Sequence, residues 1–105
     1  MSASHCVILT TTGNRDEADR LAELLVSRKL AACVQIVSIA SVYIWKGELQ
    51  KEPEHLLLIK TTSDRYADVE AAVAANHSYE VPEIIQLPVM QGLGRYLAWI
   101  DENTA

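Results

Sequence analysis

The chain lacks the short motifs that most often carry enzyme chemistry. Its 105 residues contain no CxxC, HExxH, P-loop or GxGxxG pattern, and no serine or cysteine has a visible base. No close pair of carboxylates has an apolar pocket that would separate their pKa values. The first apolar run, Cys6–Leu9, is far too short for a signal-peptide core or a membrane span. We therefore expect a cytoplasmic protein with no membrane span that is not an enzyme.

Basic residues are also few. Nine Lys and Arg stand against 14 Asp and Glu, which gives a net charge of -5, and the basic residues are scattered. Binding to nucleic acid requires a local basic patch, so this partner class is disfavoured. The two cysteines, Cys6 and Cys33, lie in apolar runs. In a reducing compartment they are expected to be core thiols rather than a disulfide, with soft-metal ligation as the alternative.

The apolar content is sufficient for one folded domain over residues 1–105, since half of the chain is hydrophobic and 22% is charged. The apolar run at Cys6–Leu9 continues into three threonines and predicts a strand that Gly13 ends. Asn14 and Glu17 then form a capping-box pattern, which predicts the start of a helix. An apolar stripe at helical spacing follows as far as Leu30.

Residues 31–62 predict a long β-hairpin, because they are rich in β-branched and aromatic residues around a Lys46-Gly47 turn. Ser38 and the Ala40-Ser41 pair are expected to bend the first arm. Pro53 cannot donate to a ladder, so the second arm needs a bulge or a free edge there.

The last third predicts a helix over residues 64–75 capped by Ser63, a strand over 84–89, and a short helix from Leu93. The predicted order is βαββαβ with an added C-terminal helix. This order is typical of an α+β, ferredoxin-like sandwich, with one antiparallel sheet and two helices on one face.

The predicted hairpin is too long for its own domain. Arms of about 14 residues measure about 45 Å, whereas a compact domain of this size spans about 35 Å. The overhang carries Ile44, Trp45 and Leu49, which are unfavourable in water, and it has unpaired strand edges. We expect a homo-oligomer built by strand pairing between chains. A hairpin that bends back onto its own domain is the alternative.

Five stretches resemble the CutA family of divalent-cation tolerance proteins, in the same order and spacing. They are 30-LAACVQIV-37, 42-VYIWKGEL-49, 57-LLIKTT-62, 77-HSYEVPEI-84 and 96-YLAWI-100. Each stretch alone is a modest signal, and the five in register are specific. The resemblance implies a ferredoxin-like protomer, a tight homotrimer with hairpins in intersubunit sheets, and a role in tolerance of divalent metal ions.

The sequence departs from the family pattern at three positions. Ser78 stands where the family usually has a proline, Gln35 where it usually has an asparagine, and Thr10 where some members have a metal-binding cysteine. A serine restricts the chain less than a proline, so the loop at 78 is expected to be less rigid. No ligand is carried over to Thr10.

The loop before the last strand carries the candidate metal ligands His77, Glu80 and Glu83. An imidazole with carboxylates suits borderline divalent ions, and Cu²⁺ is the first candidate. A tight site needs further ligands from another segment or subunit. The alternative is a plain turn, with His77 packed at a helix end and the two glutamates in water.

A second constellation combines aromatic residues with one cation: Tyr43, Trp45, Lys60 and Tyr79. It suggests a cleft for a small anionic ligand, as in a trimeric signalling or adaptor module similar to the PII proteins. Interface packing of the aromatic rings, with Lys60 reaching solvent from a strand end, is the alternative. A third interpretation is a stable scaffold with no ligand of its own.

Overall fold

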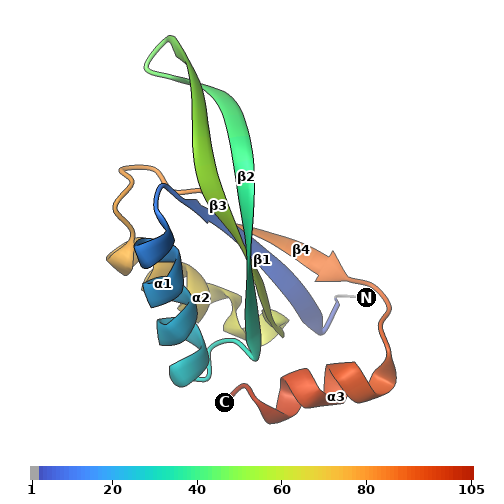
Figure 1. Ribbon diagram of the computed structural model, residues 1–105. Helices are drawn as coiled ribbons and strands as arrows, with labels where there is room; N and C mark the ends of the chain where they lie inside the picture. Colours follow the sequence, from blue (N-terminus) through green and yellow to red (C-terminus); the bar gives the residue numbers. More distant parts are fainter. Residues whose placement is uncertain (1–2) are drawn as a thin grey trace.

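The computed structural model describes residues 3–105 and has the predicted element order. Each strand and helix lies within a few residues of its predicted position (Figure 1). The elements are β1 (His5–Thr12), α1 (Arg15–Ser27), β2 (Cys33–Trp45), β3 (Glu48–Thr62), a 3-10 turn η1 (Ser63–Arg65), α2 (Tyr66–Asn76), β4 (Ile85–Val89) and α3 (Gly94–Glu102).

The four strands form one antiparallel sheet in the order β2-β3-β1-β4. This is the ferredoxin-like arrangement, so the predicted α+β fold class is confirmed. Side chains alternate between the two faces. In β1 and β3 the buried positions, such as Ile8, Leu57 and Ile59, alternate with partly exposed ones.

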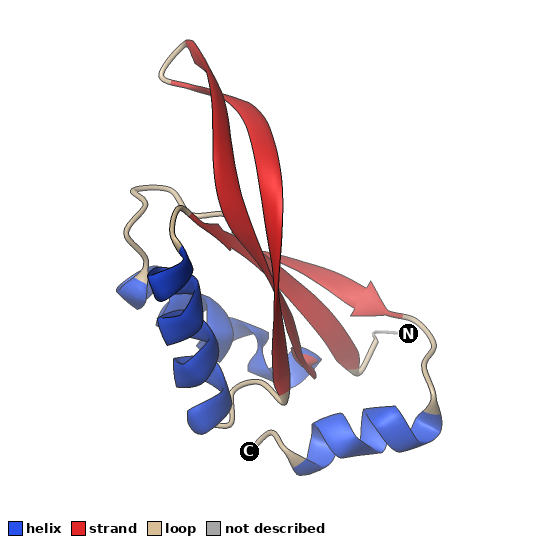
Figure 2. Cartoon of the chain, in the orientation of Figure 1, coloured by secondary structure: helices blue, strands red, loops and turns tan. Residues whose placement is uncertain are grey.

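Helices α1 and α2 cover the face of the sheet that carries these buried side chains, which we call the first face, and form the core with it (Figure 2). Leu21 and Leu25 of α1 and Val69 and Val73 of α2 are buried there. Cys6 is part of this core, as expected, whereas Cys33 is half-buried, and both thiols are free.

Helix α3 lies over one end of the second face. Its Asp101 Oδ1 lies 2.9 Å from Nε2 of His5, and the ring of its Tyr96 lies 5.8 Å from Nζ of Lys60. The rest of the second face exposes apolar side chains, including Val37, Ile85 and Leu87. Within residues 3–105, no other element covers this apolar part of the second face.

The hairpin of β2 and β3 extends past the rest of the sheet (Figure 1). Its register is unbroken from Cys33–Lys60 to Trp45–Glu48, whereas β1 pairs with β3 only from His55 onward. Lys46 and Gly47 have φ values of 50° and 82°, as a two-residue hairpin turn requires. The longest extent of the molecule is 44 Å, which agrees with the predicted overhang.

Pro53 pairs with Ala40 in this continuous register, so no bulge is present. It lies beyond the reach of β1, where β3 has β2 as its only neighbour within the described chain. The prediction of a free edge at Pro53 is therefore confirmed, and the missing backbone donor removes no ladder bond on that side.

Two predicted helix caps differ from the structure. The Asn14 side chain accepts a hydrogen bond from the Glu17 backbone N–H at 2.8 Å, as predicted, but the Glu17 carboxylate does not return to Asn14. Ser63 does not cap α2 either, because its hydroxyl donates to the carbonyl oxygen of Ala3 at 2.6 Å. In both cases the side chain binds a residue about 60 positions away in the chain instead of its own helix end: Glu17 accepts from Ser78, and Ser63 donates to Ala3.

Candidate functional site

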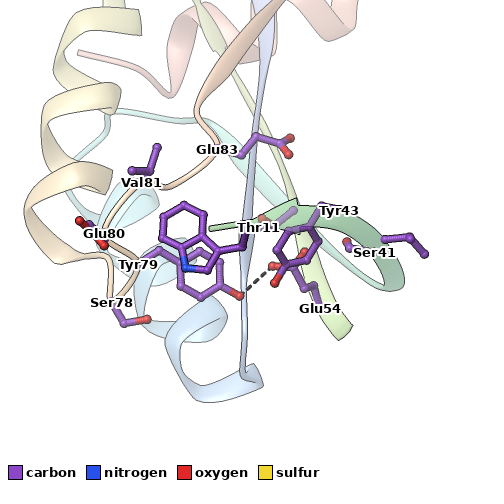
Figure 3. A pocket seen from close by; sticks show the side chains of 11 residues that line it. Thr11, Ser41, Tyr43, Glu54, Ser78, Tyr79, Glu80, Val81 and Glu83 are labelled. Atoms are coloured by element: carbon purple, nitrogen blue, oxygen red, sulfur yellow. Dashed lines mark hydrogen bonds between the residues drawn. The ribbon is translucent and has the colours of Figure 1, made fainter. Parts of the chain in front are cut away.

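A pocket of about 670 Å³ lies where the hairpin leaves the sheet (Figure 3). Residues from β1, β2 and β3 form one side of it, and the loop between α2 and β4 forms the other. The lining residues are Thr11, Ser41, Val42, Tyr43, Trp45, Glu54, Ser78, Tyr79, Glu80, Val81 and Glu83.

Tyr79 crosses the pocket and joins its two sides. Its hydroxyl donates to Oε2 of Glu54 at 2.7 Å, and Figure 3 shows this bond at the pocket wall. Burial raises the pKa of the Tyr79 phenol well above its usual range, and the hydrogen bond to Glu54 raises it further. The phenol therefore keeps its proton and acts as a hydrogen-bond donor.

The His77 ring is fully buried, and both of its nitrogens have partners. Nε2 lies 2.7 Å from the carbonyl oxygen of Thr11, so it must donate. Nδ1 lies 3.0 Å from the Tyr79 backbone N–H, so it must accept. The ring thus holds the loop against the end of β1, and neither nitrogen is free to bind a metal ion in this conformation.

Ser78 makes contacts of its own in this loop, and the expectation of a less rigid segment stays a prediction. Its backbone N–H donates to Oε2 of Glu17 at 2.7 Å, and its hydroxyl donates to Oε1 at 2.9 Å. Glu17 is only 2% exposed, on the first turn of α1. A proline at position 78 would supply neither donor, so here two hydrogen bonds replace the restraint of a proline ring.

The predicted metal ligands are brought to one loop but not to one point. Glu80 and Glu83 are exposed at the rim of the pocket, whereas His77 lies buried behind it. Within residues 3–105, no group of three or more His, Cys, Asp or Glu side chains is close enough together to hold a metal ion.

The aromatic constellation is only partly assembled. Tyr43, Trp45 and Tyr79 line the pocket, but Lys60 does not. Lys60 pairs with Cys33 and Val7 near the other end of β3, beside α3. Lys46 of the hairpin turn is not a lining residue either, but its Nζ lies 3.9 Å from Oε2 of Glu80 at the rim.

Sequence reasoning missed Glu54 and Glu17. A signal for Glu54 was present, because the two-residue turn fixes the register that puts Glu54 on the same face of the hairpin as Tyr43 and Trp45. No local signal pointed to Glu17, whose partner Ser78 is 61 residues away in the chain.

These features define a small ferredoxin-like α+β protein with a projecting hairpin, a C-terminal helix and a pocket lined by glutamates and aromatic rings. A family model described as the CutA1 divalent ion tolerance protein matches residues 6–103. The chain belongs to this family, as its five stretches suggested. It is a divalent-cation tolerance family without enzymatic activity.

Relatives from several kingdoms are similar to this chain. A divalent-cation tolerance protein CutA of Thermus thermophilus is 43% identical over 99 residues, which cover 93% of this chain and 96% of that protein. A chloroplastic CutA protein of Arabidopsis thaliana is 44% identical over 99 residues, or 93% of this chain. The match spans only 54% of that plant protein's length.

Solved structures of the family agree with the fold. A CutA1 crystal structure from Shewanella sp. SIB1 has a TM-score of 0.95 at 39% identity and covers 99% of this chain and 98% of that chain. A CutA structure from Archaeoglobus fulgidus, described as periplasmic, has a TM-score of 0.92 at 40% identity and covers 94% of this chain and 97% of that chain. Since relatives are described as periplasmic or chloroplastic, a cytoplasmic location stays a prediction. Within residues 3–105, none of the helices has the length and apolar character needed to cross a membrane.

Proposed function

We propose that this protein contributes to divalent-cation tolerance by binding a divalent ion, Cu²⁺ first, at the loop of residues 77–83 of a cytoplasmic homotrimer. The observation that supports this proposal is the pair of exposed carboxylates, Glu80 and Glu83, at the rim of one pocket. Both are free of the buried contacts that hold the loop in place. They are the groups that an incoming ion meets first.

Two carboxylates are too few for a tight site, which normally has three or four protein ligands. The remaining ligands come from a partner subunit or from His77. For His77 to bind through Nδ1, the ring must give up the Tyr79 backbone N–H, which it accepts at 3.0 Å. Cu²⁺ is the first candidate because it binds a given nitrogen and oxygen site more strongly than the other first-row divalent ions.

The trimer is supported by the apolar surface of the hairpin. Val42 is 64% exposed, Ile44 64% and Leu49 62%, at the tip of a projecting two-stranded ribbon. Within residues 3–105, the outer edges of β2 and β4 pair with no further strand. A second and third copy would cover both kinds of surface. The number of three subunits follows from the family resemblance.

The metal proposal is tested by calorimetric titration of Cu²⁺ and Zn²⁺ into the wild-type chain and into two variants. We expect saturable binding that is weakened at least tenfold in Glu80→Gln/Glu83→Gln. His77→Gln, whose amide can still donate to the Thr11 carbonyl oxygen and hold the loop, separates the two sources of the third ligand. It abolishes tight binding if His77 is a ligand, and leaves it unchanged if a partner supplies the ligand. Glu23→Gln, an exposed charge removal on α1, is the control. Replacing Cys6 and Cys33 excludes binding by thiols. Binding that survives the double variant would overturn the proposal.

The trimer is tested by sedimentation equilibrium, where we expect a mass three times that of the 11.6 kDa chain. Ile44→Lys places a charge on the hairpin surface and should shift the mass toward a single chain. Val26→Lys is the matched control, because Val26 is also exposed, at 42%, but lies on α1. Equal effects of the two substitutions would contradict an interface at the hairpin.

The signalling alternative, with an anionic ligand, has less support. Its cation, Lys60, lies outside the pocket, and the pocket carries Glu54, Glu80 and Glu83. An anion would meet three carboxylates there and one lysine at the rim. It would need Lys60 from another subunit.

A further inference from the structure

Within residues 3–105 of a single chain, the carboxylate of Glu54 is buried without a cationic partner. Glu54 is 6% exposed and lines the pocket. Its side chain has one hydrogen bond in the described chain, from the neutral hydroxyl of Tyr79. Among residues 3–105, no Lys, Arg or His side chain lies within ion-pair distance of it. A buried carboxylate is costly unless a positive charge accompanies it.

The walls beside Glu54 are aromatic. Tyr43, Trp45 and Tyr79 line the same pocket, and aromatic faces attract cations through their negative quadrupole. The chain already uses this combination at the rim. There the Lys46 ammonium lies 5.6 Å from the Trp45 ring centroid and 3.9 Å from a carboxylate oxygen of Glu80. A positive ammonium group is therefore already placed between an aromatic ring and a carboxylate at this rim.

The size of the pocket favours a molecule over a bare ion. Its volume of about 670 Å³ lies in the range of small-molecule sites. Within residues 3–105, the acidic side chains do not converge in groups of three that could hold a metal ion without further ligands. Carboxylates spread along an aromatic wall suit a positive group on a carbon chain, because the chain packs on the rings while the positive end pairs with a carboxylate.

We propose that this pocket binds a small organic cation, an alkylammonium, with Glu54 as its counter-ion and Tyr43, Trp45 and Tyr79 as its walls. Lys46 competes with the ligand at the rim. This site goes beyond the proposed metal binding, because it needs no metal ion and uses a residue outside the loop of residues 77–83.

The test is a calorimetric titration of spermidine and putrescine in the presence of EDTA, so that metal binding makes no contribution. We expect saturable binding of the amines and none of 1,4-butanediol, which resembles putrescine without the charges. Glu54→Gln keeps an acceptor for the Tyr79 hydroxyl and removes the charge. It should weaken amine binding at least tenfold, whereas Glu23→Gln should change it less than twofold.

Two further variants keep the test decisive if Glu54→Gln folds poorly. Trp45 lies outside the core of its own chain, at 40% exposure near the hairpin tip, so Trp45→Leu removes an aromatic wall and should weaken binding severalfold in a variant that keeps its assembly. Lys46→Gln removes the competing ammonium and should tighten binding severalfold.

Sedimentation confirms that each variant keeps its assembly. No saturable amine binding, or equal binding by wild type and a folded Glu54→Gln variant, would overturn the proposal. Loss of Cu²⁺ binding with retained amine binding would refute only the metal site.

Discussion

The hydrogen bond between Ser78 and Glu17 gives a stability prediction that can be worked out from the structure. Ser78→Ala removes the hydroxyl that donates to Oε1 of Glu17 at 2.9 Å. Glu17 is only 2% exposed whereas Ser78 is exposed, so water replaces the lost donor only in part. A hydrogen bond to a charged group contributes about 1.5–3 kcal/mol. We therefore expect the free energy of unfolding to fall by about 2 kcal/mol per chain.

The assay is urea unfolding at one fixed protein concentration, since assembly makes apparent stability depend on concentration. With a slope of about 2 kcal/mol/M, the expected loss lowers the midpoint by about 1 M. Ser27→Ala is the control, because Ser27 also donates through its hydroxyl, at 3.2 Å to Leu24, but on the exposed side of α1. It should change stability by less than about 0.5 kcal/mol.

A double-mutant cycle with Glu17→Gln isolates the pair. A coupling energy of at least about 1 kcal/mol is expected, because both substitutions affect the same hydrogen bond, which is partly buried. Ser78→Pro, which restores the usual family residue, should cost more than Ser78→Ala. It loses both donors, and a proline returns at most about 1 kcal/mol through the unfolded chain. A Ser78→Ala variant as stable as the wild type, with no coupling to Glu17, would refute the reasoning.

Two other predictions concern Tyr79 and the hairpin turn. Burial and Glu54 raise the Tyr79 pKa, so the folded chain holds this proton more tightly than the unfolded chain. The resulting stability is complete below about pH 10 and decreases as the pH rises above it. Tyrosinate absorbance should show Tyr79 titrating last of the four tyrosines, and Tyr79→Phe should remove that step; an early Tyr79 step would contradict this. Gly47→Ala, at φ +82°, should cost about 1 kcal/mol or more by urea unfolding. Gly94→Ala at the start of α3 meets nothing within 4 Å and should cost nothing, so equal losses would argue against strain at Gly47.

The sequence was sufficient for the fold because each element carries its own local signal. The apolar stripe of α1, the Lys46-Gly47 turn and the Asn14 cap depend on neighbours a few residues away. Periodicity and turn chemistry therefore fixed the order of the elements, and the order fixed the topology.

The candidate site was predicted less well, because its contacts join residues far apart in the chain. Glu17 bonds Ser78 rather than its own helix end, and Ser63 bonds Ala3. The pocket's buried acid, Glu54, is recognisable only when the loop carrying Tyr79 lies over the hairpin. A short motif such as His77 to Glu83 indicates where a site is, but it does not tell which of its side chains are already engaged.

The position of β1 has a consequence for how the chain acquires its structure. This first strand is central in the sheet, between β3 and β4, so its two neighbours are the segments His55–Thr62 and Ile85–Val89. The hairpin can close early because its two arms are adjacent in sequence, whereas β1 must wait for partners about 50 and 80 residues away, whose pairing requires slow loop closure. During synthesis, the sheet is complete only after residue 89 has left the ribosome. Until then the core residues Leu57 and Ile59 of the hairpin lack part of their cover, which makes the nascent chain more prone to aggregation than the complete chain.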